Sequence, residues 1–285
     1  MAKYLDPKAD VTFKKVFGEH KNLVISLLNA LLPLDEGKQV ESIEYLPSEL
    51  VPETPLGKNT IVDVRCEETG GRKFIVEMQM EWRANFKQRV LLNASKAYIK
   101  QLPRGNDYNL LQPVYSLNLV NETFEPDMEE YYHYYRLVHY LHSDKVLEGL
   151  HLVLVELPKF KAKNLTEKKM QVLWLRFLTE IGEATKEVPQ DLVDNPHVNE
   201  ALEIVEESAL SDEERARYDG FWDLVSREAT KEAEMKAAIA ERDAAKERLR
   251  QTVCNLKEVG MSVEQISKIT GLKPTEVETL WGCTK

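Results

Sequence analysis

Residues 61–80 of the chain, IVDVRCEETGGRKFIVEMQM, constrain its fold more than any other stretch. Two runs rich in β-branched residues flank a loop at 69–71, Thr-Gly-Gly. Three-residue hairpin loops place a glycine at the left-handed position, so the stretch predicts two antiparallel strands. Pairing across that loop places Asp63 opposite Glu77.

Successive side chains of a strand point to opposite faces, so this pairing sorts the hairpin into two faces. One face carries Asp63, Arg65, Ile75, Glu77 and Gln79, and the other carries Val62, Val64, Phe74, Val76, Met78 and Met80. A two-residue Gly-Gly loop would pair Asp63 with Met78 and mix polar with apolar side chains, which burial disfavours. We therefore expect the two acids to be direct cross-strand neighbours.

Carboxylates directly opposite one another repel unless a cation lies between them. Mg²⁺ is bound in proteins by one or two carboxylates together with water and substrate phosphate. Asp63 and Glu77 are therefore predicted ligands of Mg²⁺ or Mn²⁺. The plainer interpretation is a half-exposed strand with solvated acids, and composition alone favours it.

The other periodic segments place this hairpin in a mixed α/β domain. We expect one or two helices over 10–32, with Asp10 as N-cap and a break at Gly18. Further strands are predicted within 40–47, 113–124, 130–141 and 149–160, and further helices over 85–102 and 168–181.

The C-terminal part of the chain has a different composition. Residues 180–214 hold twelve acids and one base, so they account for the whole net charge of −10, and the remainder is nearly neutral. The acidity is local and does not exclude a nucleic-acid partner. A long exposed helix is expected over 221–259, with heptads interrupted at Asp243 and Lys246, followed by a helix–turn–helix pattern in the tail.

Several classes of protein do not fit this sequence. It has no long apolar run and no basic-then-apolar leader, so we expect neither a membrane span nor a secretory signal. The three cysteines lie far apart without a C-x-x-C, which favours a reducing, cytoplasmic setting. No P-loop or G-x-G-x-x-G is present, which argues against a nucleotide cofactor.

Four segments carry a resemblance to a known family: DVTFKKVFG, IVDVRCEE, FIVEMQM and FKQRVLLNASKAY. An aspartate on one strand, Glu-x-Gln on the next and a helix after them resemble the PD-(D/E)XK nuclease core. The nearer likeness is to the recombination-promoting nucleases and transposases of that superfamily. It implies a restriction-endonuclease-like mixed sheet flanked by helices, with a helical C-terminal extension. We expect a nuclease-like domain over 1–185, a charged helical extension over 186–259 and a helix-turn-helix-like tail over 260–285.

The resemblance carries over to individual residues. Asp63 and Glu77 match the metal-binding acids, and the Met78 carbonyl is a candidate further ligand. Gln79 stands where the superfamily more often has lysine, although Glu-x-Gln is an expected variant in the nearer family. Asp10 is a candidate third carboxylate as well as a candidate helix cap.

Glutamine cannot supply a positive charge to the developing phosphorane. Lys14, Arg89 and Lys96, all on predicted helices, are the candidates to replace it. The expected catalytic set is Asp63, Glu77, Gln79, Lys14 and Arg89. Helical spacing also aligns a polar stripe expected to bind DNA phosphates, or else to be an ordinary solvated face: Arg89, Asn93, Lys96 and Lys100.

These features together predict a metal-dependent DNA endonuclease, and the family name links it to recombination or mobile elements. The alternative is a DNA-binding or assembly protein that keeps the nuclease fold without cleavage. We expect DNA as partner and the C-terminal helices as candidates for self-association. His133, His139 and His142 lie among tyrosines, and we favour packing over a zinc site because no fourth ligand is evident.

Overall fold

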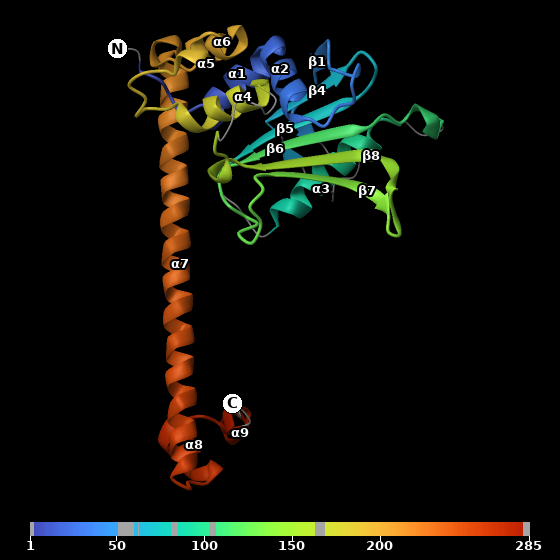
Figure 1. Cartoon of the computed structure of the whole chain (residues 1–285). Helices are drawn as coiled ribbons and strands as arrows, with labels where there is room; N and C mark the ends of the chain where they lie inside the picture. The colour runs from blue at the N-terminus through green and yellow to red at the C-terminus, as the bar shows by residue number, and fades with distance from the viewer. Residues whose placement is uncertain are drawn as a thin grey trace. The chain divides into compact units, whose positions relative to one another are not determined.

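The computed structural model describes most of the chain: residues 3–50, 60–61, 63–80, 85–102, 107–162 and 169–281. It divides into two compact units, Met1–Trp222 and Asp223–Lys285. The first unit is a mixed sheet with helices on both faces, which confirms the expected PD-(D/E)XK-like α/β fold (Figure 1).

The main sheet has six strands in the order β1-β4-β5-β6-β8-β7. Neighbours β5 and β6, and β6 and β8, run parallel, and the other neighbours run antiparallel. The strands are β1 (Ile43–Tyr45), β4 (Val64–Glu68), β5 (Lys73–Gln79), β6 (Val114–Val120), β7 (Tyr132–His139) and β8 (His142–Glu156). A separate two-stranded sheet pairs β2 (Glu49–Leu50) with β3 (Thr60–Ile61).

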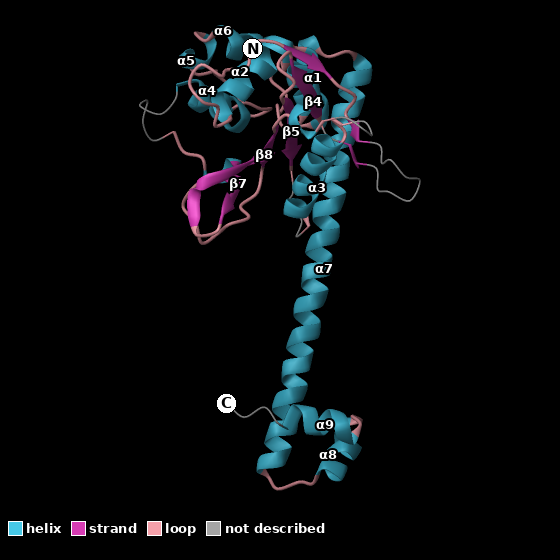
Figure 2. Ribbon diagram, turned by 90° about the vertical axis from the view of Figure 1, so that its right-hand side faces the viewer, coloured by secondary structure: helices cyan, strands magenta, loops and turns pink. Residues whose placement is uncertain are grey.

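Helices cover both faces of the main sheet. In the first unit they are α1 (Asp10–Glu19), α2 (Lys21–Leu31), α3 (Phe86–Ile99), α4 (Lys169–Glu180), α5 (Gln190–Val193) and α6 (Pro196–Ile204). Helices α1, α2 and α4 lie on one face and α3 on the other (Figure 1). Strands β7 and β8 form a long hairpin at the sheet edge (Figure 2).

The predicted pairing of the β4–β5 hairpin is confirmed. Val64 lies opposite Val76, and the Glu68 N–H donates to the Arg72 carbonyl at 3.0 Å. Gly71 has φ of 86°, the left-handed conformation that the loop requires. Glycine is suited to it because it has no Cβ.

Three details of the predicted elements are wrong. The chain breaks between α1 and α2 at His20, which is extended, and Gly18 stays helical. Asp10 is the first helical residue, and Ala9 occupies the N-cap position, so Asp10 does not cap. Strand β8 begins at His142, before the predicted start at 149, because the chain turns at 140–141.

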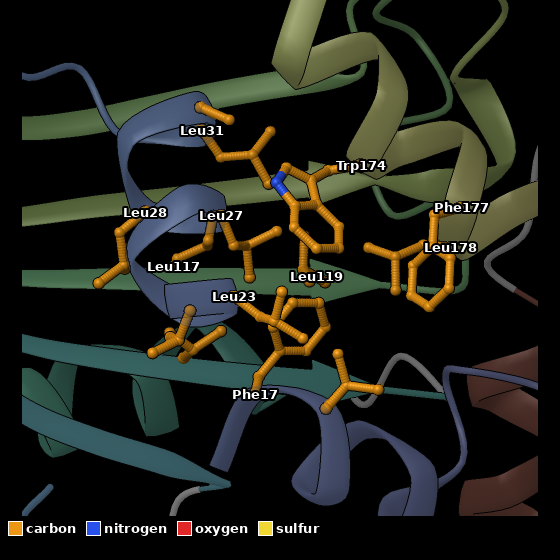
Figure 3. Packing of buried hydrophobic residues seen from close by; sticks show 14 of the residues in the cluster. Phe17, Leu23, Leu27, Leu28, Leu31, Leu117, Leu119, Trp174, Phe177 and Leu178 are labelled. Carbon is orange, nitrogen blue, oxygen red and sulfur yellow. The ribbon is translucent and has the colours of Figure 1, made fainter. Parts of the chain in front are cut away.

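The largest apolar core lies between the sheet and α1, α2, α4 and α6. Figure 3 shows the Trp174 indole among Leu27 and Leu31 of α2 and Leu119 of β6. The indole N–H donates to Ser26 Oγ at 3.0 Å, so this buried polar atom is satisfied.

This core continues past the expected domain boundary at 185. Helices α5 and α6 contribute buried side chains to it: Leu192, Val198, Ala201 and Leu202. A smaller cluster joins Leu5 and Ala9 to Leu210 and Tyr218. A boundary at 185 cuts through these contacts, and we propose that the domain ends near Trp222.

The C-terminal unit contains most of α7 (Asp212–Glu258), together with α8 (Val263–Thr270) and α9 (Pro274–Trp281). Helix α7 begins nine residues before the predicted start. Val253, Ile266 and Val277 form the small core of the unit. Across the described residues, no helix combines the length and apolarity that a membrane span needs.

Candidate active site

The two predicted acids meet where the β4–β5 ladder ends. Asp63 directly precedes β4, and continuing the register by one residue places it opposite Glu77. Its Oδ2 accepts the Met78 N–H at 2.6 Å. The side chain of Asp63 is therefore fixed to strand β5 beside Glu77.

Glu77 lies on the α3 face of the sheet and is only 6% exposed. Asn93 Nδ2 donates to Glu77 Oε1 at 2.7 Å, and Arg89 Nη2 lies 3.8 Å from Oε2. Burial raises the pKa of Glu77, and the Asn93 hydrogen bond and the Arg89 charge partly oppose that rise. The helix α3 therefore holds both carboxylate oxygens.

The surroundings of Asp63 disfavour its ionised form. Burial raises its pKa to about 7; the nearby charge of Glu77 acts in the same direction, and the Met78 N–H and Lys14 oppose it. A cation near both carboxylates would favour their ionised forms.

Lys14, on α1, places a cation near Asp63. Its Nζ lies 2.6 Å from Asp10 Oδ1 and 4.0 Å from Asp63 Oδ1. Asp10 thus forms an ion pair one helical turn away within α1. Among the described residues, no group of three His, Cys, Asp or Glu side chains is placed to hold a metal. The structure therefore does not bring Asp10 together with the two acids as a third ligand.

Gln79 lies two residues beyond Glu77, on the same face of β5. The guanidinium of Arg89 donates to Gln79 Oε1 and lies 4.9 Å from the centre of the Phe86 ring. The Arg89 side chain is 41% exposed. Arg89, one of the helical cations expected to compensate for a missing lysine, therefore contacts position 79.

The prediction that Asn93 belongs to a polar stripe on α3, together with Arg89, Lys96 and Lys100, is wrong. Asn93 is fully buried, together with Val90, Ala94 and Ala97, because this i, i+3, i+4, i+7 stripe faces the sheet. Lys96 is half-buried, and Lys100 is exposed at the C-terminal end of α3.

Two polar residues of β6 escaped the sequence interpretation. Asn118 lies beside Glu77 in the parallel β5–β6 pairing, and both Ser116 and Asn118 are fully buried. Asn118 Nδ2 donates to Ser116 Oγ at 3.1 Å and to the Val153 carbonyl at 3.1 Å. Alternation within PVYSLNLV placed both residues on one strand face, and that pattern could have revealed them.

The histidines do not converge. His133 is buried against Glu156, whereas His139 and His142 pair with each other across the β7–β8 turn. Burial would raise the pKa of Glu156, but bonds from Lys159, His133 and two backbone N–H groups bring it below the ordinary value. His133 therefore has a buried hydrogen-bond partner, whereas His139 and His142 are exposed.

The donor set at Asp63 and Glu77 fits a hard divalent cation. Two carboxylates and a neighbouring backbone carbonyl leave room in the coordination shell for water and phosphate oxygens, the arrangement that Mg²⁺ prefers. Burial raises the pKa of both acids, so it disfavours the ionised forms that would bind a cation. Lys14 and Arg89, both half-exposed, supply some compensating positive charge.

The comparison with known families identifies the family of this chain. The model of the PD-(D/E)XK nuclease family transposases matches residues 7–224. The chain belongs to this family. The matched span contains both acids, the whole of α3 and the region between 185 and Trp222. Searches of curated proteins and of solved structures found no significant match.

Membership of the PD-(D/E)XK family has two consequences. It assigns the chain to nucleases in general and implies DNA as substrate. It also agrees with the mixed six-stranded sheet flanked by helices. The family description includes transposases, so the reaction class is a nuclease- or transposase-related one.

Proposed function

We propose that the protein is a metal-dependent DNA endonuclease whose metal ligands are Asp63 and Glu77. The observation that supports this most is the register of the β4–β5 hairpin, which places the two acids opposite one another. Each is held by a separate contact: Asp63 by the Met78 N–H, and Glu77 by Asn93. Such fixed, facing carboxylates repel without a cation.

Mg²⁺ or Mn²⁺ bound here would polarise the scissile phosphate and lower the pKa of an attacking water. The Met78 carbonyl, between Glu77 and Gln79, is the proposed further ligand. Asp63 and Glu77 are the residues that would hold the ion. Asp10 pairs with Lys14, which also lies near Asp63, and the Asp10 charge itself helps to raise the pKa of Asp63.

Arg89 provides the positive charge that Gln79 lacks. The Gln79 amide oxygen accepts a hydrogen bond from the Arg89 guanidinium. Gln79 therefore orients a cation, whereas a lysine at this position would itself carry the charge. A guanidinium is always ionised and binds phosphate oxygens with two N–H groups. We assign Arg89 to the phosphate, with Lys14 on the other side of the acids.

Lys96 and Lys100 add further positive charge along α3, and we assign them to contacts with the phosphates of the DNA backbone. Phosphate contacts position DNA without reading its sequence. A role in recombination or mobile-element biology follows the family name, and we place the protein in the cytoplasm. Self-association through the C-terminal helices is part of the same proposal.

Nicking of supercoiled plasmid tests the proposal. Wild type should nick DNA with Mg²⁺ or Mn²⁺ and stop when a chelator is added. Arg89→Gln should lose activity by roughly a hundredfold or more, the magnitude typical of removing a transition-state charge contact. Arg89→Gln combined with Gln79→Lys should recover part of it, because lysine then stands at the superfamily's commoner position.

A non-catalytic DNA-binding or assembly protein is the second candidate. It is favoured by one feature: Lys14 and Arg89 already lie near the two acids. Such a protein would bind DNA equally well with and without metal and leave the plasmid intact. Joined strand products in place of nicks would instead point to a transposase reaction.

A further inference from the structure

We propose that Asn93 is a positioning residue for Glu77, and the inference rests on the proposed function. Asn93 is fully buried in the middle of α3, on the stripe that packs against the sheet. Asparagine forms helices less readily than leucine or alanine, and a buried amide is costly unless it is hydrogen-bonded. An apolar residue would therefore suit this position better for folding alone.

The contacts of Asn93 are directed at the acid. Its Nδ2 donates to Glu77 Oε1 at 2.7 Å, whereas its Oδ1 has no hydrogen-bond partner among the described residues. Among the described residues, the Asn93 amide is thus hydrogen-bonded through Nδ2, which donates to the Glu77 carboxylate, and not through Oδ1. Hydrogen bonds to a ligating carboxylate set its orientation and tune the metal.

The helix that carries Asn93 is fixed on both sides. One apolar cluster packs Ala94 and Ala97 against Ile75, and a second packs Phe86 and Val90 against strands β6 and β8. Asn93 lies between these two clusters in sequence. Its amide is therefore presented to Glu77 from a rigid support, as precise placement of a metal ligand requires.

Asn118 offers a matched comparison. It is also fully buried, on the strand next to Glu77, and its Oδ1 likewise has no partner among the described residues. Its Nδ2, however, donates to Ser116 and to the Val153 carbonyl. The two asparagines are thus both buried between α3 and the sheet. Of these two amides, only that of Asn93 donates a hydrogen bond to Glu77.

The test uses the full chain and two replacements at position 93. Asn93→Leu removes the amide while keeping its approximate size, and Asn93→Ser leaves a polar group too short to reach Glu77. We expect serine, which also leaves a cavity, to lower the melting temperature more than leucine does. Both should weaken Mn²⁺ binding, measured by calorimetry, by about 10- to 100-fold, the usual effect of removing such a partner.

A second readout separates positioning from DNA contact. Because Asn93 is buried, its replacement should lower kcat for plasmid nicking and leave KM for DNA unchanged. The control Asn118→Leu should change the melting temperature and leave Mn²⁺ affinity within twofold of wild type.

The outcomes distinguish this inference from the proposed function. Wild type that binds no Mn²⁺ would refute both. Wild type that binds Mn²⁺, with both Asn93 variants binding equally well, would refute only the role of Asn93. An equal loss of affinity in Asn118→Leu would also overturn it, since any buried amide would then have the same effect.

Discussion

The two faces of the six-stranded sheet are made by alternate residues of the same strands, yet their chemistry differs. The face under α1, α2, α4 and α6 carries one continuous apolar cluster around Trp174. The face under α3 carries two smaller apolar clusters and, on β5 and β6, the buried polar residues Glu77, Ser116 and Asn118.

The two faces therefore have different roles: one mainly stabilises the fold, and the other carries the candidate active site. Apolar burial scales with area, so the larger cluster supplies most of the favourable free energy of folding. The α3 face instead contains acids whose pKa values are raised by burial, which costs stability. The stability supplied by the large apolar cluster can then offset the cost of burying acids on the α3 face. Each prediction below tests this division.

The largest expected effect is a truncation after residue 185. It removes Leu192, Val198, Ala201 and Leu202 from the apolar cluster, and each fully buried aliphatic side chain contributes about 1.5–3 kcal/mol. That loss is comparable with the whole stability of a typical domain, about 5–15 kcal/mol. The shortened chain should show no cooperative thermal transition, whereas a chain ending at 224 should retain one. A cooperative transition in the shorter chain would restore the boundary expected from the sequence.

Trp174→Ala should be the most damaging single change on the first face. The indole is fully buried against Phe17 and Phe177, and such truncations cost about 3–5 kcal/mol. Urea denaturation measures this loss in the free energy of unfolding. Ser26→Ala, which removes only the acceptor of the indole N–H, is the control and should cost about 1–3 kcal/mol. Equal losses in the two variants would assign the effect to the hydrogen bond instead of the packing.

Asp63→Asn should stabilise the metal-free protein, and the gain should depend on pH. The folded pKa of Asp63 is about 7, above the 3.8 of a free aspartate, so the folded state binds the proton more tightly. Its ionisation therefore opposes folding fully above pH 7, and this cost disappears as pH falls from about 7 towards 4. At roughly 1.4 kcal/mol per pKa unit, the gain at high pH is at most about 4 kcal/mol.

Chemical denaturation in the presence of a chelator, repeated between about pH 4 and pH 8, gives this dependence. The stabilities of wild type and Asp63→Asn should converge at the acidic end. A difference that stays constant over the whole range would show that Asp63 titrates normally in the folded protein.

Much of the site was predictable because its signals are local. Strand alternation and the Gly71 turn determine the β4–β5 register, and so the pairing of Asp63 with Glu77. Helical spacing alone could not show that Asn93 is buried, because a polar residue on an apolar stripe resembles a solvated one until its partner is known. That partner, Glu77, lies on another element.

The domain boundary was missed for a related reason. Residues 186–214 are rich in acids, which suggested an exposed extension. The few apolar positions among them, Leu192, Val198 and Leu202, nevertheless complete a core formed by distant elements. Composition averages over such positions, whereas packing depends on where each one points.

Calorimetric titration of wild type, Asp63→Asn and Glu77→Gln with Mg²⁺ tests the central claim most directly. Each substitution keeps the size of the side chain and removes one charge from the proposed ligand set. We predict one site in wild type and affinity at least about a hundredfold weaker in each variant, a difference of about 2.8 kcal/mol or more. The variants should fold as well as wild type, since each relieves repulsion between the acids. Identical binding curves for all three proteins would contradict the assignment of Asp63 and Glu77 as metal ligands.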